Sequence, residues 1–99
     1  MIKTPYKLFF GTLGNEIRIQ ILHALIDKPK NVTELTKELR VDQTTISKNL
    51  KRLQTCSFVY NKKEGKNSIY SLNEKTIKPL LKLIDNHTQK YCAHLCERK

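Results

Sequence analysis

The chain contains little of what several other classes of protein depend on. Its 99 residues include no tryptophan, three glycines and three prolines. No apolar run approaches the roughly 18 residues of a membrane span, and no signal-peptide core or cleavage pattern is visible near the start. We therefore expect a cytoplasmic protein without a membrane partner. Three cysteines, an odd number, favour reduced thiols over a disulfide framework.

Acidic residues are also scarce. The 9 aspartates and glutamates are outnumbered by 19 lysines and arginines, which gives a formal charge of +10. A chain of this length forms one small domain, so we expect a single domain over residues 1–99. This excess of positive charge indicates an anionic partner. Nucleic acid is the first candidate, because its phosphates release counterions when Lys and Arg approach.

Apolar residues at helical spacing predict five helices, with a β-hairpin before the last one. The first helix opens at Pro5 and runs to Phe10, where Gly11 and Gly14 break it. The other four helices begin at capping residues, which are Asn15, Asn31 or Thr33, Asp42 and Asn73. The predicted fold class is mainly α with a small β-hairpin (α+β), in the order α-α-α-α-β-β-α.

Beyond residue 57 the pattern changes to that of strands. Residues 58–60 and 68–72 are rich in strand-forming side chains, and Gly65 between them tolerates a positive φ. We expect a hairpin with a basic tip formed by residues 62–67. Such a tip can reach a minor groove or its flanking phosphates. Its lysines would also protect an exposed strand edge against aggregation, which is the structural alternative.

Several sequence blocks follow one another at characteristic spacings. They are residues 13–22 (LGNEIRIQIL), 32–35 (VTEL), 43–53 (QTTISKNLKRL), and the hairpin segments 63–66 (KEGK) and 69–72 (IYSL). Together they resemble the ArsR/SmtB family of prokaryotic repressors. The resemblance extends from residue 13 to residue 72, and the last predicted helix matches the dimerisation helix of that family.

The resemblance implies a winged helix-turn-helix, homodimeric through its first and last helices. The helix-turn-helix would occupy about 33–55, the wing about 58–72 and the dimerisation helix about 74–97. It also implies that the two recognition helices enter successive major grooves. An inducer, often a metal ion, would switch the DNA affinity. Because a two-fold axis relates the copies, the operator should be near-palindromic double-stranded DNA.

Two features depart from the family pattern. Ser57 stands before the wing, where the family usually has glycine, so we expect this turn to be built differently. Residues 34–39 (ELTKEL) lack the cysteine pair that many metal sensors of the family carry at this place. The best-known metal box of the family is therefore absent.

The segment 43–55 has a polar face opposite Ile46, Leu50 and Leu53. Short polar side chains suit base edges, whereas lysine and arginine suit phosphates. The predicted DNA contacts on this helix are Gln43, Thr44, Thr45, Ser47, Lys48, Lys51 and Arg52. The predicted contacts on the wing are Lys62, Lys63 and Lys66. An ordinary solvated helix surface is the alternative.

The last predicted helix has an apolar face that is too wide for a single packing contact. We expect it to pair with its copy in a second chain, alongside aromatic residues of the first helix. The predicted interface consists of Tyr6, Phe9, Phe10, Ile77, Leu80, Leu81, Ile84, Tyr91 and Leu95. Core packing within one chain is the alternative.

The same helix carries the candidate metal ligands, which are Asp85, His87, Cys92, His94 and Cys96. The order Asp85-Asn86-His87 resembles the start of the zinc site on the dimerisation helix in one branch of the family. These side chains could hold a regulatory Zn²⁺ or another soft or borderline ion, although no cofactor is required. The two histidines and the other three ligands fall on opposite flanks of the apolar stripe, so one site using all five is not expected. Thiol chemistry and simple packing are the alternatives.

Two further residues are expected to be structural rather than functional. Cys56 ends the recognition helix and is predicted to be buried. His23 falls among the apolar residues of its helix, where a core or interface histidine is commoner than a metal ligand.

No catalytic constellation is visible in the sequence, and we do not expect an enzyme. We expect a sequence-specific double-stranded DNA-binding transcriptional regulator, a dimeric repressor relieved by an inducer such as a metal ion or thiol chemistry. One alternative is a winged-helix module that docks to proteins of the transcription machinery. The other is a constitutive DNA binder without an inducer.

Overall fold

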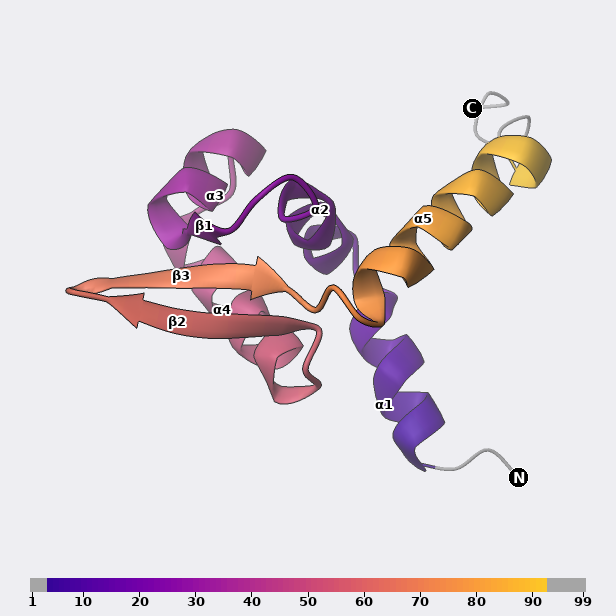
Figure 1. Ribbon diagram of the computed structural model, residues 1–99, viewed down its shortest axis with the longest axis horizontal. Coiled ribbons are helices and arrows are strands. Elements are labelled where there is room, and N and C mark those ends of the chain that lie inside the picture. Colours follow the sequence, from indigo (N-terminus) through magenta and orange to yellow (C-terminus); the bar gives the residue numbers. More distant parts are fainter. Residues whose placement is uncertain (1–3, 93–99) are drawn as a thin grey trace.

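The computed structural model describes residues 4–92 and contains five helices and a small antiparallel sheet (Figure 1). Its elements are α1 (Thr4–Leu13), α2 (Glu16–Ala24), β1 (Lys30–Asn31), α3 (Val32–Leu39), α4 (Gln43–Thr55), β2 (Val59–Glu64), β3 (Asn67–Leu72), α5 (Ile77–His87) and a π-helical turn (Thr88–Cys92). The predicted class, mainly α with a β-hairpin, is confirmed. Within the described part of the chain, no helix is both long and apolar enough to cross a membrane.

Figure 1 shows that the elements separate into two ends. The hairpin of β2 and β3 projects at one end, beside α3 and α4. The helices α1 and α5 lie together at the opposite end. The parts predicted to meet DNA are thus separated in space from those predicted to meet a second chain.

Side-chain caps begin both helices of the helix-turn-helix. The Asn31 side chain accepts a hydrogen bond from the Glu34 N–H at 2.8 Å, and the Glu34 carboxylate accepts one from the Asn31 N–H at 2.9 Å. Asp42 caps α4 by accepting a hydrogen bond from the Thr45 N–H at 2.9 Å. Both starts were predicted, and Asn31 rather than Thr33 is the cap of α3.

The core forms where α4 packs against α2, α3 and β2. The helix α4, which is the predicted recognition helix, contributes Ile46, Leu50 and Leu53, each with no exposed surface. The other buried apolar residues are Ile21, Leu22, Ala24, Leu25, Leu35, Phe58, Val59, Leu72, Ile77 and Leu81. One side of α4 is therefore fixed by the core of the domain.

The sheet has one strand more than the sequence predicts. β1 pairs with β3, with Lys30 opposite Tyr70 and Asn31 opposite Ile69, so the strand order is β1-β3-β2. Two residues are too few to show the alternation that identifies a strand. The pairing connects the start of α3 to the wing.

The hairpin turn is tighter than predicted. β2 and β3 are paired along their full length, which leaves Gly65 and Lys66 as the turn. Gly65 has φ +62°, a conformation that such two-residue turns require. Lys62 and Lys63 therefore lie in β2 rather than in the tip, but all three lysines remain exposed.

Two helix boundaries also differ from the prediction. α1 continues through Gly11 instead of ending at Phe10, since one glycine inside a helix costs only about 1 kcal/mol. α5 begins at Ile77, because the Asn73 side chain accepts from backbone N–H groups of the turn at residues 74–76. Its α-helical part ends at His87 rather than near residue 97.

Ser57 ends α4 in the way that a glycine would. Its φ is +60°, and its N–H donates to the Gln54 carbonyl at 3.0 Å. The Phe58 N–H donates to the Leu53 carbonyl at 2.9 Å, which completes a Schellman motif. The turn before the wing is therefore not built differently, and the serine adopts a left-handed conformation that costs about 1–2 kcal/mol.

Candidate nucleic-acid interface

The polar face of α4 is open to solvent. Gln43, Thr44, Ser47, Lys48, Lys51 and Arg52 are all exposed. The opposite face of the helix is buried in the core, so these side chains are presented on a rigid support. A helix exposed in this way can enter a major groove.

Thr45 differs from the other predicted contacts on α4. It is half-buried, and its hydroxyl donates to the Asp42 carboxylate at 2.8 Å. Hydrogen bonds from this hydroxyl and from the Thr45 N–H hold the pKa of Asp42 below its ordinary value. The Asp42 cap is therefore ionised near neutral pH, and the Thr45 hydroxyl is committed to it.

The wing and the two helices of the motif share a concave surface. This hollow of about 240 Å³ is lined by Asn31, Val32, Thr33, Gln43, Lys66, Asn67 and Ser68. It brings together Gln43 of α4 and Lys66 of the wing turn, which were predicted as DNA contacts from separate parts of the sequence. Thr33, Asn67 and Ser68 were not predicted from the sequence, because their place in this hollow depends on the folding of the wing against α3.

A second hollow lies on the α2 side of the recognition helix. It has a volume of about 450 Å³ and is lined by Arg18, Thr45, Lys48, Asn49 and Arg52, which we call the Arg18 pocket. Arg18 and Asn49 were not predicted as site residues from the sequence. Arg18 is distant from α4 in the chain, so only the packing of α2 on α4 reveals its place.

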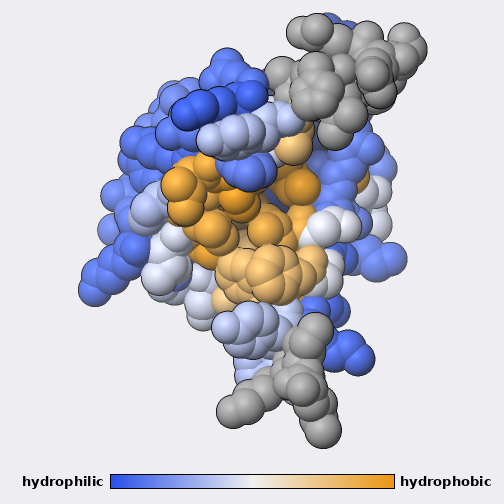
Figure 2. All heavy atoms as spheres, turned by 90° about the vertical axis from the view of Figure 1, so that its right-hand side faces the viewer, coloured by the Kyte–Doolittle hydropathy of each residue, from blue (hydrophilic) through white to orange (hydrophobic). Residues whose placement is uncertain are grey.

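Hydrophobic side chains gather in a hollow at the α1 and α5 end, surrounded by hydrophilic residues (Figure 2). The large apolar side chains exposed at this end are Tyr6 (62 %), Leu8 (48 %) and Phe10 (60 %) on α1, Leu83 (67 %) on α5 and Tyr91 (57 %) after it. Leu83 lies outside the apolar stripe predicted for this helix. An exposed apolar surface of this kind marks an interaction site.

The structure narrows the predicted dimer interface. Ile77 and Leu81 are 3 % and 2 % exposed and pack in the core of the single chain, which leaves little of either side chain for a partner. Phe9 is half-buried, with its ring 5.0 Å from that of Phe58 between centroids. Leu80 and Ile84 are half-buried, and Leu95 lies outside the described residues.

The candidate metal ligands do not converge in the described part of the chain. The Asp85 carboxylate is occupied by His23, and the His87 ring lies against that of Tyr91 at 5.0 Å. Among residues 4–92 no group of three or more His, Cys, Asp or Glu side chains is placed to hold a metal ion. His94 and Cys96 lie outside this range. The described residues therefore do not fit a metal site.

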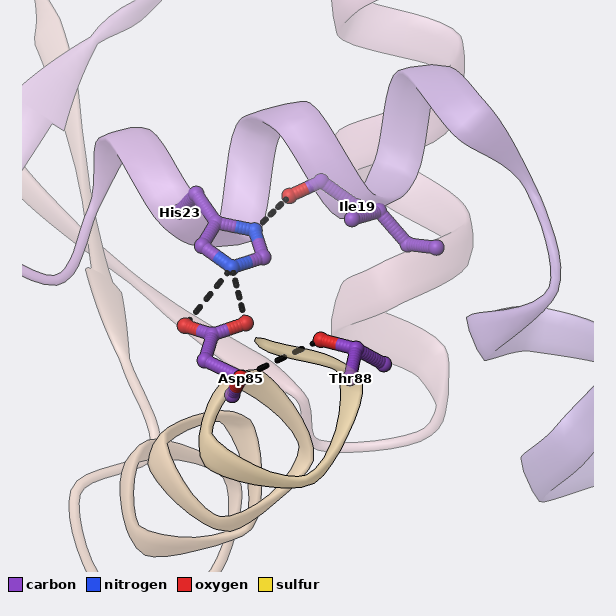
Figure 3. Close-up of polar contacts among 4 residues, drawn as sticks. All are labelled: Ile19, His23, Asp85 and Thr88. Carbon is purple, nitrogen blue, oxygen red and sulfur yellow. Dashed lines mark hydrogen bonds and ion pairs between the residues drawn. The ribbon is translucent and has the colours of Figure 1, made fainter. Parts of the chain in front are cut away.

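His23 is exposed and links α2 to α5, so of the two structural places expected for it, core or interface, the core one is wrong (Figure 3). Nδ1 lies 2.9 Å from the Ile19 carbonyl oxygen, and Nε2 lies 3.0 and 3.1 Å from the two Asp85 oxygens. Both nitrogens thus face acceptors, which only the protonated ring can satisfy. Burial lowers the pKa of His23, but the hydrogen bonds to Asp85 and Ile19 outweigh it and raise the pKa overall.

Raising the pH from about 5.5 to about 8 is expected to loosen α5 from α2. Because the folded state raises the pKa of His23, the stabilisation is complete below the unfolded value of about 6.5 and is lost as the pH rises through the folded value. Thermal unfolding of the wild type and of His23→Gln at both pH values checks this. The unfolding temperature of the wild type should exceed that of the variant only at the lower pH. An equal difference in unfolding temperature at both pH values would contradict the role assigned to His23.

Cys56 is half-buried rather than fully buried. Its Sγ lies 3.5 Å from the hydroxyl oxygen of Thr12, which has no exposed surface. This contact joins the end of α4 to α1, in agreement with a structural role.

Comparisons with known proteins agree with this geometry. Residues 15–61 match the family described as "Bacterial regulatory protein, arsR family". "Transcriptional activator HlyU" of Vibrio cholerae is 32 % identical over 72 residues, which cover 73 % of this chain and 67 % of that protein. The HTH-type transcriptional regulator Rv0081 of Mycobacterium tuberculosis is 32 % identical over 80 residues, 77 % of this chain and 70 % of that protein.

Solved structures show the same fold. The crystal structure of Rv0081 superposes with a TM-score of 0.82 at 28 % identity and covers 98 % of both chains. The homodimeric winged helix-turn-helix DNA-binding domain of Mb0332 from Mycobacterium bovis gives a TM-score of 0.84 at 23 % identity, covering 91 % of this chain and 83 % of that one. The relatives named here are regulatory or DNA-binding proteins, not enzymes. The family resemblance is thus confirmed: this chain is a winged helix-turn-helix transcriptional regulator that belongs to the ArsR family.

Proposed function

We propose that this regulator is a homodimeric repressor that binds a specific, near-palindromic double-stranded operator and releases it in response to an inducer. The observation that carries the proposal is the two-sided character of α4. Leu50 is fully buried, whereas its neighbours Asn49 and Lys51 turn toward the Arg18 pocket and the solvent. Base-reading and phosphate-binding side chains are thus presented on a helix that cannot rotate.

A second copy of the chain is the partner proposed for the apolar hollow at the α1 and α5 end. Tyr6, Phe10 and Leu83 are each more than half exposed there, and the structural relative Mb0332 is described as homodimeric. A two-fold axis through this end places the two recognition helices on one side of the dimer. They would then reach half-sites about 34 Å apart on the duplex.

Substitutions on α4 are expected to separate affinity from specificity. Lys48→Ala should weaken binding to operator and random duplexes alike. It should lower the magnitude of the slope of log affinity against log salt by about 1.8 for the dimer, because it removes one phosphate contact in each half-site. Gln43→Ala and Thr44→Ala should change the preferred sequence and leave the slope unchanged, because they remove contacts to bases. Titrations of fluorescent duplexes at several salt concentrations measure both quantities.

The control is Lys82→Ala, which removes an exposed lysine of α5 at the other end of the molecule. It should leave slope and preference unchanged. Equal losses on operator and random duplexes for Lys48→Ala, Gln43→Ala and Thr44→Ala would refute the division of roles. Weak binding of the wild type to every duplex would favour the alternative of a module that docks to proteins.

The inducer is tested on the same complex. Operator affinity is measured with Zn²⁺, with a chelator and with an oxidant, in the wild type and in Cys92→Ser, whose thiol is free and half-buried in the structure. If one of these conditions changes the operator affinity of the wild type but not that of Cys92→Ser, the result supports control of DNA binding through this cysteine. Identical affinities under all conditions would identify a constitutive DNA binder.

A further inference from the structure

In the part of the chain that the structure describes, no acidic group balances the positive charge of the Arg18 pocket. Three of its five lining residues, Arg18, Lys48 and Arg52, are cationic and none is acidic. The ion pairs found among residues 4–92 involve His23 with Asp85 and Lys30 with Glu38, so neither arginine has a carboxylate partner there. A concave surface with one sign of charge attracts small groups of the opposite sign.

Arg18 is held in place by neutral groups. Its Nε donates to the Asn49 side-chain oxygen at 2.9 Å, and one terminal nitrogen donates to the Gly11 and Thr12 carbonyls at 3.4 and 3.3 Å. Asn49 is fixed in turn, because its amide donates to the Thr45 carbonyl at 2.9 Å. The guanidinium is therefore oriented before any ligand arrives, by hydrogen bonds to uncharged groups.

Each arginine retains donors that the described residues do not use. No hydrogen bond within residues 4–92 takes up the second terminal nitrogen of Arg18. Among residues 4–92, Arg52 donates only through Nε, at 3.5 Å to the Thr12 hydroxyl, so both of its terminal nitrogens are unused there. Guanidinium groups with free terminal nitrogens match the oxygens of a phosphate, which they can bind in a bidentate way.

From these observations we infer that the Arg18 pocket is a binding site for a phosphodiester, with Arg18, Lys48 and Arg52 as its three cationic groups. This inference rests on the proposed function, because the ligand is a backbone phosphate of the duplex that α4 enters. Lys48 belongs both to the exposed face of α4 and to the pocket, so a duplex on that face brings its backbone to the pocket. Arg18 thereby holds the backbone from α2, outside the recognition helix.

Arg18→Gln tests the site. It should weaken binding to operator and random duplexes by about tenfold at about 0.15 M salt. It should also lower the magnitude of the salt slope by up to about 1.8 for the dimer, because the bound phosphate in each half-site loses one of its three cations. Duplexes in which single phosphates are replaced by uncharged methylphosphonates locate the contact. One replacement in each half-site should weaken binding by the wild type more than binding by Arg18→Gln, which keeps only Lys48 and Arg52 against that phosphate.

Matched variants separate this role from folding and from general charge. Lys28→Gln removes an exposed lysine from the turn after α2 and should keep the wild-type slope. Arg52→Gln loses only a weak contact of an exposed side chain, so it should fold normally and lower the slope in the same way as Arg18→Gln. Thermal unfolding without DNA reports the stability of each variant.

The outcomes are distinct. If Arg18→Gln and Arg52→Gln both kept the salt slope of the wild type, the pocket would not be a phosphate site. DNA binding by the wild type would be unaffected by that result. Absence of duplex binding by the wild type would overturn the proposed function itself. Inorganic phosphate is the probe for a free anion, added at equal ionic strength. If it raised the thermal stability of the wild type but not of Arg18→Gln, and if the two proteins had equal salt slopes for duplex binding, the ligand of the pocket would be a free phosphate and not a backbone phosphate.

Discussion

Phe10→Glu is expected to convert the dimer into a monomer and to weaken operator binding by about 100-fold or more. The Phe10 ring is 60 % exposed on α1, so the glutamate costs the single chain little. In the dimer the same carboxylate would be buried in an apolar interface without a partner, which costs several kcal/mol. A monomer also engages one half-site at a time and loses the gain from simultaneous binding. Sedimentation at micromolar concentration and operator titration measure the two effects.

Phe10→Leu is the matched control, because it keeps an apolar side chain at the same place. It should remain dimeric and retain most of the operator affinity. Leu83→Glu tests the surface from α5, where the leucine is 67 % exposed. A dimeric Phe10→Glu protein with wild-type affinity would show that the two copies meet elsewhere.

The helix-turn-helix was predictable because its determinants are local. Asp42 caps α4, three apolar residues mark the buried face, and the helix begins and ends at the predicted residues, Gln43 and Thr55. Asn31 and Glu34 are three residues apart in a capping box, which the sequence shows directly. Capping residues and apolar spacing lie within one or two helical turns, so they can be recognised without knowing how distant parts of the chain pack.

The misses involve contacts between distant parts of the chain. The bond between His23 and Asp85 joins residues 62 positions apart, and Arg18 meets Asn49 across 31 positions. A helical wheel shows that α5 has an apolar face, but it does not show which part packs on the chain's own core. Ile77 and Leu81 pack there, which only the position of α5 after the sheet determines.

Leu50→Ala is expected to lower the free energy of unfolding by about 3 kcal/mol without changing the salt slope of DNA binding. Leu50 has no exposed surface and lies in the core where α4 packs on α2, α3 and β2, so its truncation leaves a cavity beneath the recognition helix. Such a loss is a large fraction of the stability of a small domain. Denaturant unfolding at one fixed protein concentration measures it, because dimerisation adds to the apparent stability.

The neighbouring residue Lys51 provides the control, because its substitution should change DNA binding and not stability. Lys51 is exposed on the side of α4 proposed to face DNA, so Lys51→Ala should keep the unfolding free energy within about 0.5 kcal/mol and lower the magnitude of the salt slope by about 1.8 for the dimer. Leu50→Met, which conserves volume, should cost less than about 1.5 kcal/mol. If Leu50→Ala lowered the slope, or if Lys51→Ala unfolded the protein, the two faces of α4 would not divide support from recognition. Adjacent positions with opposite effects follow only from a helix that is buried on one side and bound to a polyanion on the other.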